Sequence, residues 1–97
     1  KVKKVREAVG DNFDLIVEVH RCMSTPEAVA FAQEIEKYHP MVLEDPIVPD
    51  NVDAMAYVAE KTNIPIATGE RFTYFSEFEI LMQRQAARYV SPDVCAV

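Results

Sequence analysis

Three glutamates at equal spacing are the residues whose types and positions could do chemistry together. Glu18, Glu44 and Glu70 each follow a short apolar segment, and the interval from Glu18 to Glu44 equals that from Glu44 to Glu70. Asp93 follows a fourth such segment after a slightly shorter interval. Clustered carboxylates repel one another, and a hard divalent cation such as Mg²⁺, which prefers oxygen ligands, relieves that repulsion. Pattern alone leaves a plainer interpretation open, in which acidic residues after strands are favoured by the N-termini of the helices that follow.

His20 is a second candidate, because it lies two residues after Glu18. If that segment stays extended, both side chains point to the same side of the strand. A histidine beside a metal site could be a ligand or an acid/base, since its pKa lies near neutrality. A lone histidine is more often structural, and His39, before Pro40 at a helix end, is assigned no chemistry.

The elements that must position these residues alternate between helical and extended patterns. Helices are expected at 1–9, 24–35, 51–61 and 73–85, and strands at 13–19, 41–43, 64–67 and 88–90. Gly10 is expected to end the first helix, and the sequence from Ser24 to Glu27 has the form of a capping box. The apolar stripes predict inward-facing side chains, among them Val2 and Val5 in the first helix and Phe75, Phe78, Leu81 and Met82 in the fourth.

Short apolar strands separated by helices predict a parallel α/β fold, because parallel neighbours need long crossovers. In a barrel of this kind the C-terminal strand ends share one face, which would bring the three glutamates together. A doubly wound sheet is the alternative, but no Gly-x-Gly-x-x-Gly turn favours a dinucleotide-binding version. No linker divides residues 1–97, so a single domain is expected.

Composition excludes several classes of partner. The net charge is −6 with no dense basic cluster, so nucleic acid is a poor partner. No apolar run approaches the roughly 20 residues that span a bilayer, and no signal peptide is visible. The two cysteines have no metal-ligand spacing and are expected to be idle or buried thiols, which favours the cytoplasm.

Four motifs in order resemble one known family. They are Glu18-Val19-His20, Leu43-Glu44-Asp45-Pro46, the segment from Pro65 to Arg71 with its Gly69-Glu70-Arg71, and Pro92-Asp93. Together they resemble the mandelate racemase and muconate lactonising branch of the enolase superfamily, and most of all its acid-sugar dehydratases, such as galactonate dehydratase. The resemblance implies that Glu18, Glu44 and Glu70 bind Mg²⁺, that His20 is the acid for the departing hydroxyl, and that Asp93 orients a histidine base on the next strand.

The sequence also departs from the family's pattern. Glu18 stands where these families usually carry aspartate, and Arg21-Cys22 follows His20 where Gly-Arg is usual. The resemblance implies the middle portion of a TIM-like catalytic barrel, about four parallel strands alternating with four helices, without the capping domain or the histidine base. The resemblance further implies a hydro-lyase acting on a sugar acid, but the 97 residues alone are expected to be inactive.

Alternatives remain open at this point. A racemase or epimerase of the same family would share the metal site but differ in its acid/base groups. A non-catalytic α/β scaffold or interaction module would carry the carboxylates as solvated charges. Open sheet edges suggest either a two-fold homodimer with eight strands in total or membership of a longer chain.

Overall fold

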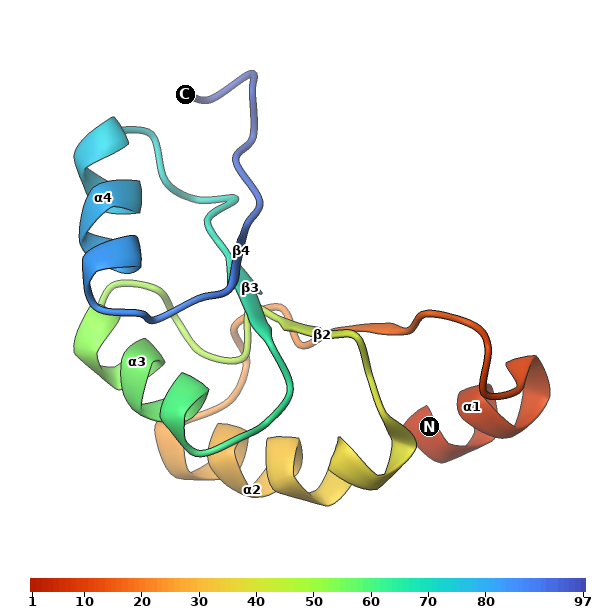
Figure 1. The fold of residues 1–97 in the computed structure, drawn as a ribbon. Helices are drawn as coiled ribbons and strands as arrows, with labels where there is room; N and C mark the ends of the chain where they lie inside the picture. The colour runs from red at the N-terminus through yellow and green to blue at the C-terminus, as the bar shows by residue number, and fades with distance from the viewer.

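The computed structural model describes residues 1–97 and consists of four parallel strands that alternate with four α-helices (Figure 1). The elements are α1 (Val2–Val9), β1 (Ile16–Glu18), α2 (Thr25–Ile35), the 3₁₀ helix η1 (Glu36–Tyr38), β2 (Val42–Glu44), α3 (Val52–Glu60), β3 (Ile66–Thr68), α4 (Phe75–Gln83) and β4 (Tyr89–Val90). The strands pair in the order β1-β2-β3-β4. The predicted α/β fold is confirmed.

Helices α2, α3 and α4 follow one another in an arc along one side of the sheet, as Figure 1 shows. The core lies between this arc and the strands, and its fully buried side chains include Leu43 of β2, Ile66 of β3, Met55 of α3 and Leu81 of α4. Burial of each such side chain stabilises the fold by about 1.5–3 kcal/mol. This packing fixes the strands, and the strands in turn fix the loops that follow their C-terminal ends.

Local sequence signals place the helix ends as expected. Glu27 accepts hydrogen bonds from the backbone N–H of Ser24 at 2.8 Å and from its hydroxyl at 2.7 Å, which confirms the capping interaction. The side chain of Asn51 accepts from the backbone N–H of Ala54 at 3.0 Å and caps α3. Gly10 ends α1 at a φ of 79°, a conformation that glycine adopts without strain.

Some sequence expectations about the elements are wrong. The first strand is confined to Ile16–Glu18 rather than 13–19, because β2 offers it only three partner residues. In α4, Phe75 is 80% exposed and Met82 is 56% exposed, so neither faces the core. Val5 of α1 is exposed as well, because that helix packs mainly against η1.

Both edge strands carry exposed apolar residues, namely Ile16 on β1 and Tyr89 and Val90 on β4. Each of these two edge strands presents unpaired backbone groups of the kind that pair with a further strand.

Cys22 and Cys95 are both free and exposed rather than buried. No helix is long and apolar enough to cross a bilayer.

Candidate active site

The register of the sheet places two of the predicted ligands opposite each other. Glu18 and Glu44 are the last residues of β1 and β2, and their Cα atoms are partners in the parallel ladder. Glu70 lies two residues beyond the end of β3, on the loop that leads to α4. All three residues therefore lie at or just beyond the C-terminal ends of neighbouring strands, the face that carries the active site in parallel barrels.

The electrostatics of Glu44 reflect this crowding. Burial raises the pKa of its carboxyl above the ordinary value, and the negative charges of Glu18 and Asp45 raise it further. Glu70 adds a smaller effect of the same sign. Negative charge is therefore concentrated at this end of the sheet, as it would be in a site for a cation.

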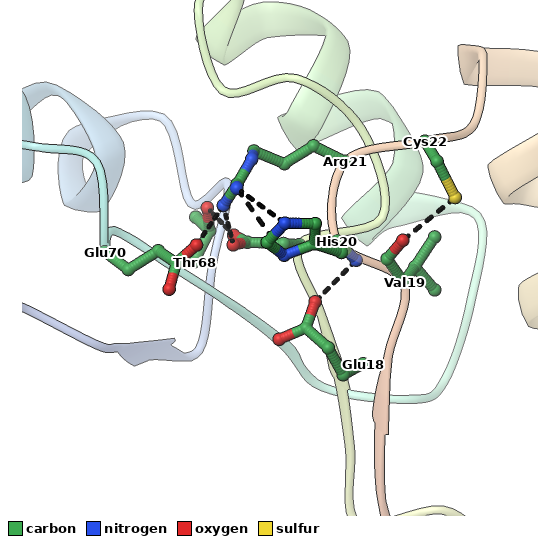
Figure 2. A network of polar contacts seen from close by, with 8 residues as sticks. Glu18, Val19, His20, Arg21, Cys22, Thr68 and Glu70 are labelled. Carbon is green, nitrogen blue, oxygen red and sulfur yellow. Dashed lines mark hydrogen bonds and ion pairs between the residues drawn. The ribbon is translucent and has the colours of Figure 1, made fainter.

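Glu70 has a partner of its own. Its carboxylate accepts a hydrogen bond from the guanidinium of Arg21 and forms an ion pair with it. Arg21 reaches across the site from the loop after β1 (Figure 2). The hydrogen bond from Arg21 holds the pKa of Glu70 below its usual range, and the same contact raises the pKa of Arg21. The side chain of Glu70 is nevertheless 42% exposed, against 16% for that of Arg21.

Asp45 anchors Arg21 from the other side. One carboxylate oxygen of Asp45 accepts from Arg21 Nη1 at 3.0 Å, and the other accepts from the hydroxyl of Thr68 at 2.6 Å. Asp45 and Thr68 are each only 1% exposed. The backbone N–H of Arg21 also donates to the carbonyl of Asp45 at 2.7 Å, so these two loops are joined through both backbone and side chains.

The loop after β1 turns sharply instead of remaining extended. His20 has a φ of 58° and Arg21 a φ of 65°, which is left-handed backbone that costs energy for residues with a Cβ. The segment therefore does not stay extended through His20, which was the condition for Glu18 and His20 to point to the same side of a strand. Instead Glu18 Oε1 accepts from the backbone N–H of His20 at 2.5 Å, and the imidazole lies beside Arg21, with His20 Nε2 3.2 Å from Arg21 Nη2 (Figure 2).

Asp93 lies three residues past β4, in a turn where its Oδ1 accepts from the backbone N–H of Cys95 at 2.9 Å. Its charge raises the pKa of Glu70 slightly, whereas the charge of His20 lowers it. The five residues predicted from the sequence thus lie at or just beyond the C-terminal ends of the strands, at one end of the sheet. As their side chains lie, however, no three His, Cys, Asp or Glu groups are close enough together to hold a metal ion.

Sequence reasoning missed Arg21 and Asp45 as members of this site. Their contact joins two loops far apart in the chain, and hydrophobic periodicity carries no information about such a pair. The available signals were their neighbours, because Arg21 directly follows His20 and Asp45 directly follows Glu44.

Comparisons with known proteins show which proteins share this fold and sequence. A D-galactonate dehydratase family member from Enterococcus gallinarum is 38% identical over 88 residues, which is 91% of this chain and 22% of that protein. A mandelate racemase/muconate lactonizing enzyme-like protein from Roseovarius sp. TM1035 is 42% identical and superposes with a TM-score of 0.95 over 99% of this chain and 24% of that one. A mutant L-talarate/galactarate dehydratase liganded with Mg and L-glucarate is 32% identical, with a TM-score of 0.94 over 99% of this chain and 24% of that one.

The chain spans about a quarter of the length of the proteins it matches. Within that quarter the match is complete, since the family model described as enolase C-terminal domain-like covers residues 1–97. The chain therefore belongs to the enolase C-terminal domain-like family, as part of a domain like that of the acid-sugar dehydratases.

Proposed function

We propose that the chain forms part of the catalytic barrel of a magnesium-dependent acid-sugar dehydratase. The observation that carries this proposal is the position of Glu18, Glu44 and Glu70 at or just beyond the ends of three neighbouring parallel strands, with Glu18 and Glu44 in direct register. The dehydratases among its relatives support the reaction class.

The donor set fits a hard divalent cation. Three carboxylates offer only oxygen ligands, which suit Mg²⁺ better than metals that prefer nitrogen or sulfur. The crowding that raises the pKa of Glu44 is the charge pattern that a cation would relieve. Glu18 and Glu70 would have to turn away from their present partners, the backbone N–H of His20 and the guanidinium of Arg21.

Magnesium held by these carboxylates would stabilise the negative charge that develops on the substrate's carboxylate oxygens when the neighbouring carbon loses its proton. His20 lies beyond the end of β1 and is assigned as the acid that protonates the departing hydroxyl. Asp93 is assigned the task of orienting a histidine base that other residues of the barrel would supply. Loss of the proton and of the hydroxyl, as water, leaves an enol that becomes a 2-keto-3-deoxy acid.

The test uses the complete enzyme to which this proposal assigns the chain, incubated with sugar acids and Mg²⁺ in D₂O. A dehydratase forms a 2-keto-3-deoxy acid. A racemase or epimerase exchanges the α-proton for deuterium and inverts the configuration at the α-carbon without losing water, and a non-catalytic scaffold does neither. In a dehydratase, His20→Gln should slow water loss by about 100-fold or more while α-proton exchange persists, because the base and the metal ligands remain. Inversion without water loss would favour the racemase alternative.

The edges of the sheet must also be covered in this proposal. Relatives four times as long favour further strands of the same chain over a second copy. Sedimentation of the 97-residue chain distinguishes the two, since the homodimer alternative requires a stable dimer of eight strands in total.

A further inference from the structure

Arg21 occupies a place that matters if Glu70 binds a cation. Arg21 is the only basic residue that forms an ion pair with any of the three proposed metal ligands, and its partner among them is Glu70. Arg21 holds a φ of 65°, a left-handed backbone that a residue with a Cβ adopts only at a cost in energy. The chain therefore tolerates backbone strain at the point where it introduces a positive charge.

The two acidic partners of Arg21 differ in their freedom to move. The side chain of Asp45 is 2% exposed, and its second oxygen is fixed by the Thr68 hydroxyl at 2.6 Å. The side chain of Glu70 is 42% exposed, and Arg21 is its one ion-pair partner. Rotation of Glu70 is therefore the easier way to break the three-residue cluster, and it leaves Arg21 in place on Asp45.

We infer that Arg21 is an internal counter-cation that holds Glu70 away from the other two glutamates until a divalent cation displaces it. This inference rests on the proposed function, because it requires Glu70 to be a metal ligand. Glu70 then exchanges one positive partner for another, and the metal-free site avoids three unpaired carboxylates at one end of the sheet. Arg21, still held by Asp45, is a positioning residue in this scheme.

The physical consequence is a lower affinity for the metal. When a ligand binds only the molecules in a competent arrangement, its apparent dissociation constant equals the intrinsic one divided by the fraction of molecules in that arrangement. Partly exposed ion pairs are individually weak. The ion pair between Arg21 and Glu70, together with the positive charge of Arg21 near the metal, should therefore weaken Mg²⁺ binding by about threefold to tenfold. Removal of Arg21 should therefore tighten metal binding, whereas removal of a residue that supports a bound metal would weaken it.

The experiment is a calorimetric titration with Mg²⁺ of the protein, of Arg21→Met and of Arg71→Met. Arg71 directly follows Glu70, is exposed and forms no ion pair, so its removal takes the same charge from the neighbourhood without breaking the contact. We expect Arg21→Met to bind Mg²⁺ about threefold to tenfold more tightly than the parent, and Arg71→Met to differ by less than about twofold. Unchanged or weaker binding by Arg21→Met, or an equal gain in Arg71→Met, would overturn the inference.

Two further arms keep the result interpretable. If Arg21→Met does not fold because Asp45 is left buried without its cation, the double variant Arg21→Met/Asp45→Asn removes the charge while keeping an acceptor for Thr68. The double variant should bind Mg²⁺ about threefold to tenfold more tightly than Asp45→Asn alone, because the negative charge of Asp45, which also favours a cation, is absent from both. Absence of Mg²⁺ binding in the parent and in every variant would overturn the proposed metal site itself, whereas binding by the parent without a gain in the variants would overturn only the role of Arg21.

Discussion

Asp45→Ala is the substitution for which the structure predicts the largest effect among the polar residues. The side chain is buried, with one oxygen 2.6 Å from the Thr68 hydroxyl and the other 3.0 Å from Arg21 Nη1. Alanine removes both acceptors at once and leaves the hydroxyl of Thr68, itself only 1% exposed, without a partner.

The magnitude follows from two costs. A buried hydroxyl left without its hydrogen bond costs about 1–3 kcal/mol. The φ of 44° at Asp45 is left-handed backbone, which costs alanine about 1–2 kcal/mol and aspartate or asparagine less. We therefore expect Asp45→Ala to lower the free energy of unfolding by about 2–5 kcal/mol, a large share of the 5–15 kcal/mol typical of a folded domain.

Urea unfolding followed by circular dichroism measures this loss. Asp45→Asn should cost clearly less than Asp45→Ala, because asparagine tolerates the backbone and keeps an acceptor for Thr68. Asp53→Ala is the matched control, since Asp53 is 74% exposed and makes a surface ion pair with Arg84 at 3.2 Å, worth about 0–1 kcal/mol. A loss for Asp45→Ala no greater than that for Asp53→Ala would refute the reasoning.

Three other predictions concern the scaffold. Met55→Ala should lower the free energy of unfolding by about 2–5 kcal/mol, because Met55 is fully buried. Met82→Ala, at a site that is 56% exposed, should change it by less than about 0.5 kcal/mol. Equal losses for the two variants in urea unfolding would contradict the packing described. Asn51→Ala should cost about 1 kcal/mol through loss of the α3 cap, with Asn51→Ser much milder in the same assay. The pKa of Glu36 is lowered chiefly by the backbone N–H of Asn63, so its stabilising effect is complete above the unfolded value of about 4.3 and is lost as pH falls through the lower folded value. Thermal melts between pH 3 and pH 6 should therefore show a steeper acid loss for the parent than for Glu36→Gln, and parallel curves would count against this.

The sequence was informative wherever structure is decided locally. The capping interaction of Ser24 with Glu27 and the glycine end of α1 involve residues at most four apart, and both are as expected. Alternating apolar and amphipathic segments were enough to predict the alternation of helices and strands along the chain and the parallel pairing of the strands, because short buried strands joined by helices have few other arrangements.

The errors arise where a distant partner decides the outcome. Phe75 and Met82 satisfy the helical period of α4, but a side chain is buried only if another element covers it, and periodicity does not report that element. The turn at His20 is a second case. The contacts of Arg21 with Asp45 and Glu70 stabilise a left-handed backbone at His20 and Arg21 that neither of these two residues prefers by itself. The joint placement of the three glutamates after the strand ends followed from their equal spacing, whereas their present side-chain partners could not be anticipated.

The central claim is that Glu18, Glu44 and Glu70 form one site for a divalent cation, and Glu44 tests it best because it lies between the other two. The measurement is a calorimetric titration with Mg²⁺ of the protein, of Glu44→Gln and of the exposed control Glu60→Gln. We predict saturable binding by the parent and the control and no binding by Glu44→Gln, which should also melt higher than the parent without metal because repulsion at the strand ends is relieved. Binding that survives Glu44→Gln, or no binding by any of the three proteins, would contradict the account.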